Sequence, residues 1–403
     1  MESFQIFLSF YPLWVPLFLA AVLWKLWIVY IRTKFFLEQK NIVLELKIPR
    51  EVLKTPLAME VFLSALYQTT GEHTFIDRYW EGKVRPWFSL EIVSLGGQVK
   101  FFIWTWEKWK NFVESQLYAQ YPGIEVHEVP DYAKMVTFDK EKYKLWACDF
   151  ELSAPDPYPI KTYLDFTLES TQTEEENKTD PITNLIEALG SLGPGEQMWI
   201  QIMIRAHKAE KTKHGTWFEK VDWQHEAEME IEKIKQKAKK ETHGKDDGEE
   251  FSEFKLTSGD KEKIKAIERS IAKNAFDCGI RGIYLAEREK YRKVYEPILR
   301  TLFKPYSSPH LNGFMPNHHA WSNKFNYPWQ DYKEMRQNRS NHHVVEAYKR
   351  RSFFHAPHQS SNPFVLNTEE LATIYHFPGK VSETPTFDRI AAKKAEPPAN
   401  LPI

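Results

Sequence analysis

Histidines gather near the carboxyl end of the chain, and their side chains could do chemistry. Seven lie between residues 305 and 358: His310, His318, His319, His342, His343, His355 and His358. Imidazole is a common metal ligand and acid–base group, so an enzyme with a His-rich site in 305–358 is one hypothesis. The paired histidines are adjacent rather than four residues apart, and no helix is evident to align them. This spacing favours structural or solvent-exposed histidines.

Motifs of the common enzyme classes are missing from the sequence. It contains no P-loop, no Gly-x-Ser-x-Gly elbow and no His-Glu-x-x-His zinc helix, since His225-Glu226 is followed by Met229 at the second ligand position. The two cysteines, Cys148 and Cys278, exclude a disulfide scaffold, and both are expected in the core. We therefore expect a non-enzymatic protein without catalytic residues, cofactor or metal.

Two short stretches combine basic and aromatic residues, as single-stranded nucleic-acid sites do. They are Asp77-Arg78-Tyr79-Trp80 and Arg85-Pro86-Trp87. The alternative is a structured loop over a sheet, with arginine stacked on tryptophan. The 54 basic and 55 acidic residues give a net charge of −1, which provides no general electrostatic attraction for nucleic acid. We expect nucleic acid to be contacted only indirectly, and a membrane-tethered nucleic-acid binder remains an alternative.

An uncharged run from Phe4 to Trp24 predicts a transmembrane helix. A helix of about 20 apolar residues crosses the hydrocarbon of a bilayer. The run is too long for a signal peptide and is not followed by a small-residue cleavage site. Basic residues follow it at Arg32, Lys34 and Lys40, so the positive-inside rule places the remaining chain in the cytoplasm. Residues 1–40 are thus predicted to anchor a single-pass protein in the cell membrane.

The sequence pattern after residue 40 predicts an α+β fold with two ferredoxin-like α/β sandwich domains. In 41–135 the order is strand, helix, strand, strand, helix, strand, with Gly96-Gly97 as a hairpin turn. A second domain, 143–304, has similar elements and a charged helical insertion at 207–259. The remaining region, 305–403, is predicted to be irregular, apart from a short helix at 368–377 and a Pro-rich tail.

The short helix is predicted to begin at Asn367, with Glu370 completing a capping box. Leu371, Ile374 and Tyr375 share one face, and so short a helix needs a docking surface. That surface could belong to the chain's own second domain or to a partner protein.

Several motifs resemble an uncharacterised family of single-span membrane proteins from small-genome, candidate-phylum bacteria. They include Ile76-Asp77-Arg78-Tyr79-Trp80, Asp156-Pro157-Tyr158-Pro159 and Leu192-Gly193-Pro194-Gly195. The segment from Phe364 to Pro378, with Ala395-Glu396-Pro397-Pro398, is similar to the region ahead of the motor domain in conjugation and type IV secretion ATPases. This second resemblance implies that a P-loop ATPase acts as a separate chain.

The leading hypothesis is a non-enzymatic, membrane-anchored component of a conjugation-like or type IV secretion-like translocation apparatus. Its expected partners are the lipid bilayer and a P-loop ATPase in trans. The substrate and the oligomeric state are left open.

Overall fold

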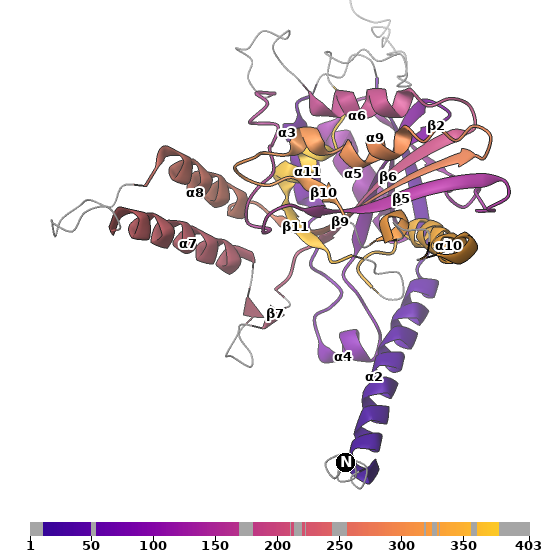
Figure 1. The fold of residues 1–403 in the computed structure, drawn as a ribbon, viewed down its shortest axis with the longest axis horizontal. Helices are drawn as coiled ribbons and strands as arrows, with labels where there is room; N and C mark the ends of the chain where they lie inside the picture. Colours follow the sequence, from indigo (N-terminus) through magenta and orange to yellow (C-terminus); the bar gives the residue numbers. More distant parts are fainter. Residues whose placement is uncertain are drawn as a thin grey trace, which may run out of the picture.

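The strands of this protein join into one large antiparallel sheet with helices on both faces (Figure 1). The computed structural model describes residues 11–49, 54–168, 180–209, 211–212, 220–221, 223–243, 256–317, 320–324, 329, 331–355 and 361–378. The mixed α/β fold with an N-terminal apolar helix is confirmed. The sheet is shared by the two predicted domains.

Within the described residues nine strands form the sheet, in the order β10-β5-β9-β6-β2-β3-β1-β4, and β11 pairs with β9 outside this path. Their bounds are β1 Asn41–Lys47, β2 Trp87–Leu95, β3 Gln98–Trp106, β4 Glu125–Val129, β5 Tyr143–Leu152, β6 Glu196–Ala206, β9 Ala275–Glu287, β10 Phe314–Pro316 and β11 Phe364–Asn367. Strands β2 and β6 join the two halves, with Glu91 opposite Gln201 at the middle of their pairing. A separate pair, β7 Lys211–Thr212 and β8 Lys220–Val221, lies in the insertion.

Side chains alternate along each strand, so the sheet has two buried faces. The first, which we call the helical face, is covered by α3 Pro56–Ala65, α5 Lys110–Gln120, α6 Pro181–Gly190, α9 Tyr295–Thr301 and α11 Thr368–Ile374. The second, the anchor face, is covered by α10 Met335–Lys349, by residues 351–355 and by the end of α2 Tyr11–Glu38. The near-continuous apolar strands follow from this double coverage.

Most local predictions match the structure. The Gly96-Gly97 turn has φ values of 62° and 94°, and α6 is capped by Asp180, whose side chain accepts from the amide of Ile182. The capping box of Asn367 and Glu370 is also present, although α11 ends at Ile374 rather than at 377.

The region after residue 304 holds more regular structure than the sequence pattern predicts. Helix α10 was not predicted, although its 15 residues cover much of the anchor face. Strand β10 forms one edge of the sheet. Strand β11 pairs with β9, with Phe364 opposite Cys278. The predicted Pro-rich tail lies outside the described residues.

The charged insertion forms a helical hairpin that projects from the body (Figure 1). It comprises α7 Trp223–His243 and α8 Ser258–Ile271, so the helical part extends beyond the predicted end at residue 259. The two helices share a small apolar core of Ala227, Ile231, Ile264 and Ile267.

Candidate functional site

The late histidines do not come together in the part of the chain that the structure describes. His342 and His343 lie on α10, where their rings contact Phe138 and Trp321 at centroid distances of 5.0 and 6.3 Å. His355 is buried beside Phe36, and burial lowers the pKa of this imidazole well below its usual value. His318, His319 and His358 lie outside the described residues. Among the described residues, no three His, Cys, Asp or Glu side chains lie close enough together to bind a metal ion.

Both cysteines and the second of the two basic–aromatic stretches, Arg85-Pro86-Trp87, are buried. Cys148 and Cys278 are fully buried, and desolvation raises the pKa of each thiol well above its usual value. A thiol in this state is a poor nucleophile. Arg85 and Trp87 are also buried, so neither is available to stack on a nucleic acid. Trp80 is 60% exposed and lies on a loop beside α2.

Leu371, Ile374 and Tyr375, predicted to dock on the chain's own second domain or on a partner, lie in the chain's own core. Leu371, Ile374 and Tyr375 are fully buried in the core of the helical face. Tyr375 donates a hydrogen bond to the carbonyl of Phe102, and α11 packs extensively on α3 in the first half of the chain. The surface that covers α11 therefore comes from this chain, and part of it belongs to the first half of the chain, which was not among the predicted surfaces.

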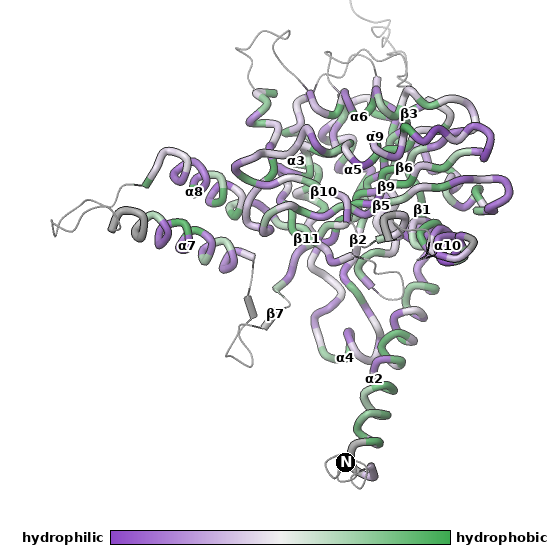
Figure 2. Tube along the Cα trace, viewed as in Figure 1, coloured by the Kyte–Doolittle hydropathy of each residue, from purple (hydrophilic) through white to green (hydrophobic). Residues whose placement is uncertain are grey.

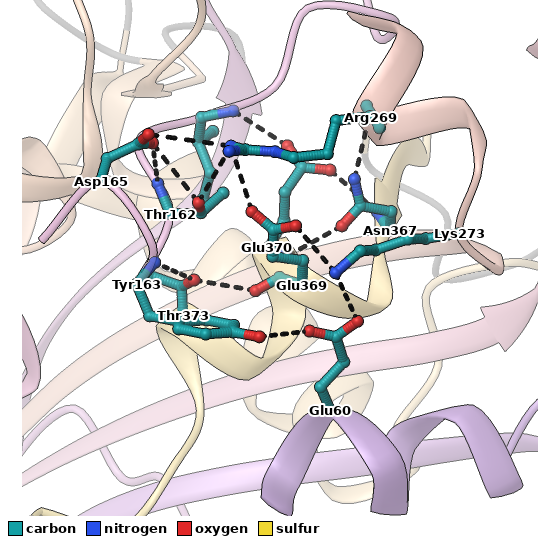
Figure 3. Close-up of polar contacts among 12 residues, drawn as sticks. Glu60, Thr162, Tyr163, Asp165, Arg269, Lys273, Asn367, Glu369, Glu370 and Thr373 are labelled. Atoms are coloured by element: carbon teal, nitrogen blue, oxygen red, sulfur yellow. Dashed lines mark hydrogen bonds and ion pairs between the residues drawn. The ribbon is translucent and has the colours of Figure 1, made fainter. Parts of the chain in front are cut away.

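A cluster of charged and polar side chains connects α11 to the rest of the fold (Figure 3). We call it the seam cluster; its members come from α3, from α8 and the turn that follows it, from the end of β11 with α11, and from the segment 160–165. Lys273 lies 2.7 Å from a carboxylate oxygen of Glu60 and 2.8 Å from one of Glu369. Glu369 also pairs with Arg269 at 3.2 Å, and the Tyr163 hydroxyl donates to Glu60 at 2.6 Å.

The electrostatics of the seam cluster favour a structural role. Burial opposes the charge of Lys273, but its hydrogen bonds to Glu369 and Glu60 outweigh this and raise its pKa. A lysine with a raised pKa stays protonated and does not act as a nucleophile or base. Burial raises the pKa of Glu370 to about 8, against the opposing effect of amide hydrogen bonds from Asn367 and Ile160. The cluster joins four segments that are distant in sequence.

A second set of polar side chains crosses the anchor face as one row, which we call the polar row. Glu91 on β2 lies opposite Gln201 on β6, Gln201 opposite Arg281 on β9, and Arg281 opposite Asp149 on β5. All four are fully buried. Arg281 and Asp149 form an ion pair at 2.8 Å, and the amide of Gln201 donates to Glu91 at 3.2 Å.

Arg351 covers one end of the polar row. Its guanidinium donates to both carboxylate oxygens of Glu91, at 2.9 and 3.1 Å, and to both of Asp131, at 2.5 and 3.0 Å. The hydroxyls of Ser89 and Tyr132 also donate to Glu91. Arg351 is fully buried, so this bidentate pairing is shielded from solvent.

The sequence analysis missed both clusters. A usable pattern was present at Glu91, which is the only charged residue in the largely apolar strand β2. A charge at an inward position of a buried strand needs a partner. The partner of Glu91, Arg351, lies 260 residues further along the chain, so the pattern identifies the position but not the pairing.

The junction between α2 and the sheet is built from close packing. Ile31 is 5% exposed, and Phe35 and Phe36 contact Trp106 and Trp87 edge to face at 5.9 and 5.4 Å. A Cβ atom on Gly82 would approach the carbonyl oxygen of Ile31 to 2.6 Å, so only glycine allows this loop to lie on the helix.

The junction also borders a cavity of about 430 Å³ between α2 and the anchor face, lined by Trp87, Trp104, Trp106, Phe36 and Phe353 among others. Helix α2 is long and apolar enough to span a membrane, and Figure 2 shows its hydrophobic character beyond the body. Trp24 lies on α2, whereas Phe4 lies outside the described residues.

Comparison with known proteins identifies the family of this chain but does not indicate an activity. No curated protein matches this chain. A family model matches residues 41–390, which span both halves of the sheet, the charged insertion, α10 and α11. With most of its length matched, the chain belongs to the family described as a domain of unknown function, DUF8128.

Proposed function

We propose that this protein is a non-enzymatic, single-pass membrane component that holds a rigid α/β body at the cytoplasmic face of the cell membrane. The observation that carries the proposal is the junction of α2. The helix continues from its apolar part into the body, where Ile31 is buried in the chain's own core. A flexible tether would not need such packing, so the fixed junction supports a protein whose body is held in one orientation. Arg32, Lys34 and Lys40 support the cytoplasmic placement.

We further propose that the body consists of two ferredoxin-like units fused edge to edge. If the four strands of each half are numbered along the chain, their order across the sheet is fourth, first, third and second. The two series are β4-β1-β3-β2 and β10-β5-β9-β6. The halves meet through their equivalent second strands, β2 and β6, as in an internal pseudo-dimer. Such a fusion provides one broad, stiff body rather than two mobile domains.

The pairing of buried charges supports a structural role over an enzymatic one. In the polar row and the seam cluster, Glu91, Asp149, Glu60 and Glu369 each have a cationic partner from the same chain. Active sites more often keep a titratable group poised near neutral pH in an open cleft. Glu370, whose pKa is raised by burial, is fully buried and completes the capping box of α11 with Asn367.

The narrower proposal is that the protein serves a conjugation-like or type IV secretion-like apparatus, together with a separate P-loop ATPase. It rests on the resemblance of the segment 364–378. Because α11 is used internally, we place the partner contact elsewhere, and residues 379–403 are the first candidate.

Co-purification tests this proposal. The tagged full chain would be extracted in mild detergent from the cells that produce it, and its partners identified by mass spectrometry. We expect a P-loop ATPase with the full chain, and its loss when residues 379–403 are deleted. Deletion of residues 367–403 is the contrasting control, because removing Leu371, Ile374 and Tyr375 should destabilise the body itself.

Two outcomes would count against the proposal. If no ATPase accompanies the intact chain, the secretion-like role is wrong. If the purified chain carries stoichiometric zinc, the enzyme hypothesis becomes the better one.

A further inference from the structure

Helix α4, Phe75–Tyr79, lies beside α2 on the side of the body from which α2 leaves (Figure 1). The indole nitrogen of Trp27 donates to the carbonyl of Tyr79 at 2.9 Å. The rings of Trp24 and Tyr79 are 5.6 Å apart, and those of Trp27 and Trp80 are 6.1 Å apart. These contacts place α4 at the level of residues 24–27 of α2.

The apolar side chains of this loop point into solvent. Phe75, Ile76 and Trp80 are 62%, 61% and 60% exposed; the first two begin α4 and Trp80 directly follows it. The charged neighbours are paired within the loop: Asp77 with Lys83 at 2.9 Å, and Arg78 with Glu72 at 3.2 Å. Pairing of these charges lowers the desolvation free energy that is required to move the loop into a less polar medium.

The level of α4 along α2 coincides with the end of the uncharged run. That run ends at Trp24, Lys25 follows, and Trp24, Trp27 and Tyr30 are exposed on α2. Tryptophan and tyrosine favour the membrane–water interface, where an amphipathic ring is partly hydrated. Together α2 and α4 thus present one continuous group of exposed aromatic side chains around residues 24–30 of α2.

We infer that α4 is a second membrane contact, with Phe75, Ile76 and Trp80 inserted among the lipid headgroups beside α2. The occupant of this surface is the lipid bilayer itself, because the surface continues the predicted span. The inference rests on the membrane attachment in the proposed function, and it does not depend on any ATPase. The contact would prevent the body from rotating about the axis of α2 and from tilting freely.

Depth-dependent fluorescence quenching tests this inference on the full chain in lipid nanodiscs. The natural cysteines, Cys148 and Cys278, are fully buried, so a single added cysteine can be labelled selectively with an environment-sensitive fluorophore. The test position is Ile76→Cys. Val294→Cys, which is 58% exposed near α9, is the matched control, and Leu19→Cys, 58% exposed on α2, marks the bilayer interior.

We expect the label at 76 to show blue-shifted emission and to lose most of it to a spin-labelled lipid quencher placed near the headgroups. A quencher deep in the acyl chains should act less at 76 and most at 19. The label at 294 should respond to aqueous iodide and to neither lipid quencher. Repeating the measurement with Trp80→Cys guards against a local effect of one substitution.

The failures are distinguishable. If the labels at 76 and 80 behave like the label at 294 while the label at 19 is quenched, the chain spans the bilayer and the α4 contact is wrong. Stronger deep than shallow quenching at 76 would also overturn the interfacial placement. If the label at 19 escapes both lipid quenchers, the membrane attachment in the proposed function fails as well.

Discussion

Replacing Arg351 by methionine should destabilise the body strongly, because the change leaves the buried carboxylate of Glu91 without its cation and leaves Asp131 with only the more distant Lys134, at 3.9 Å. Glu91 is fully buried, and the Asp131 side chain is 7% exposed. The substitution removes four charge-assisted hydrogen bonds. Methionine fills much of the same volume, and the left-handed backbone at this position, with φ of 48°, is equally strained for both residues. The loss is therefore electrostatic.

Removing one partner of a buried ion pair typically costs about 3–5 kcal/mol. The entropy of unfolding is about 2.1 cal/mol/K per residue, so for a chain of 403 residues 1 kcal/mol corresponds to about 1.2 °C of melting temperature, and we expect a decrease of about 4–6 °C. Differential scanning calorimetry and urea denaturation of the full chain in detergent would measure it. Arg350→Met is the matched control: Arg350 is 64% exposed and pairs with Glu346 on α10, so its loss should cost about 1 kcal/mol or less.

A double-mutant cycle tests the electrostatic explanation itself. Combining Arg351→Met with Glu91→Gln removes one of the unpaired charges and should recover about 0.5–3 kcal/mol of coupling. If Arg351→Met costs no more than Arg350→Met, or if the two changes are simply additive, the buried pairing does not stabilise the fold as argued.

Three further outcomes follow from the packing. Gly97→Val should destabilise far more than Gly96→Val, because a Cβ at Gly97 would meet the carbonyl oxygen of Leu192 at 2.6 Å, whereas the closest atom to one at Gly96 is 3.6 Å away; equal melting temperatures would contradict this. Deleting residues 1–30 should leave the body folded, whereas deleting 1–40 also removes Ile31, Phe35 and Phe36 and should cost about 3 kcal/mol or more of the free energy of unfolding, measured with urea. Burial raises the pKa of Glu370 from 4.5 to about 8, so its contribution to stability is full below pH 4.5 and is lost as the pH rises to about 8. Glu370→Gln keeps a capping residue but does not titrate, so the stability of the wild type relative to this variant should fall by up to about 5 kcal/mol over that range, and a difference that is flat or rises with pH would refute the assignment.

Local structure was largely predictable from sequence. The strand pattern of 87–105, the glycine turn at 96–97 and the capping box of Asn367 and Glu370 all appear as expected. Each depends on residues within a few positions of one another, so the chemistry of single residues and their spacing determines it. The apolar run that forms α2 was likewise predictable from neighbouring residues alone. Helix α10 was missed because its sequence is mostly polar, and its buried side is completed by the anchor face.

Tertiary structure decided how these parts combine. The join of β2 with β6, the pairing of β11 with β9 and the burial of Leu371, Ile374 and Tyr375 involve segments separated by about a hundred residues or more. Strand edges are chemically similar, so a sequence pattern shows that a strand needs a neighbour without showing which one. The same holds for buried charges: the sequence determined that Glu91 would need a cation, and only the fold decided that Arg351 supplies it.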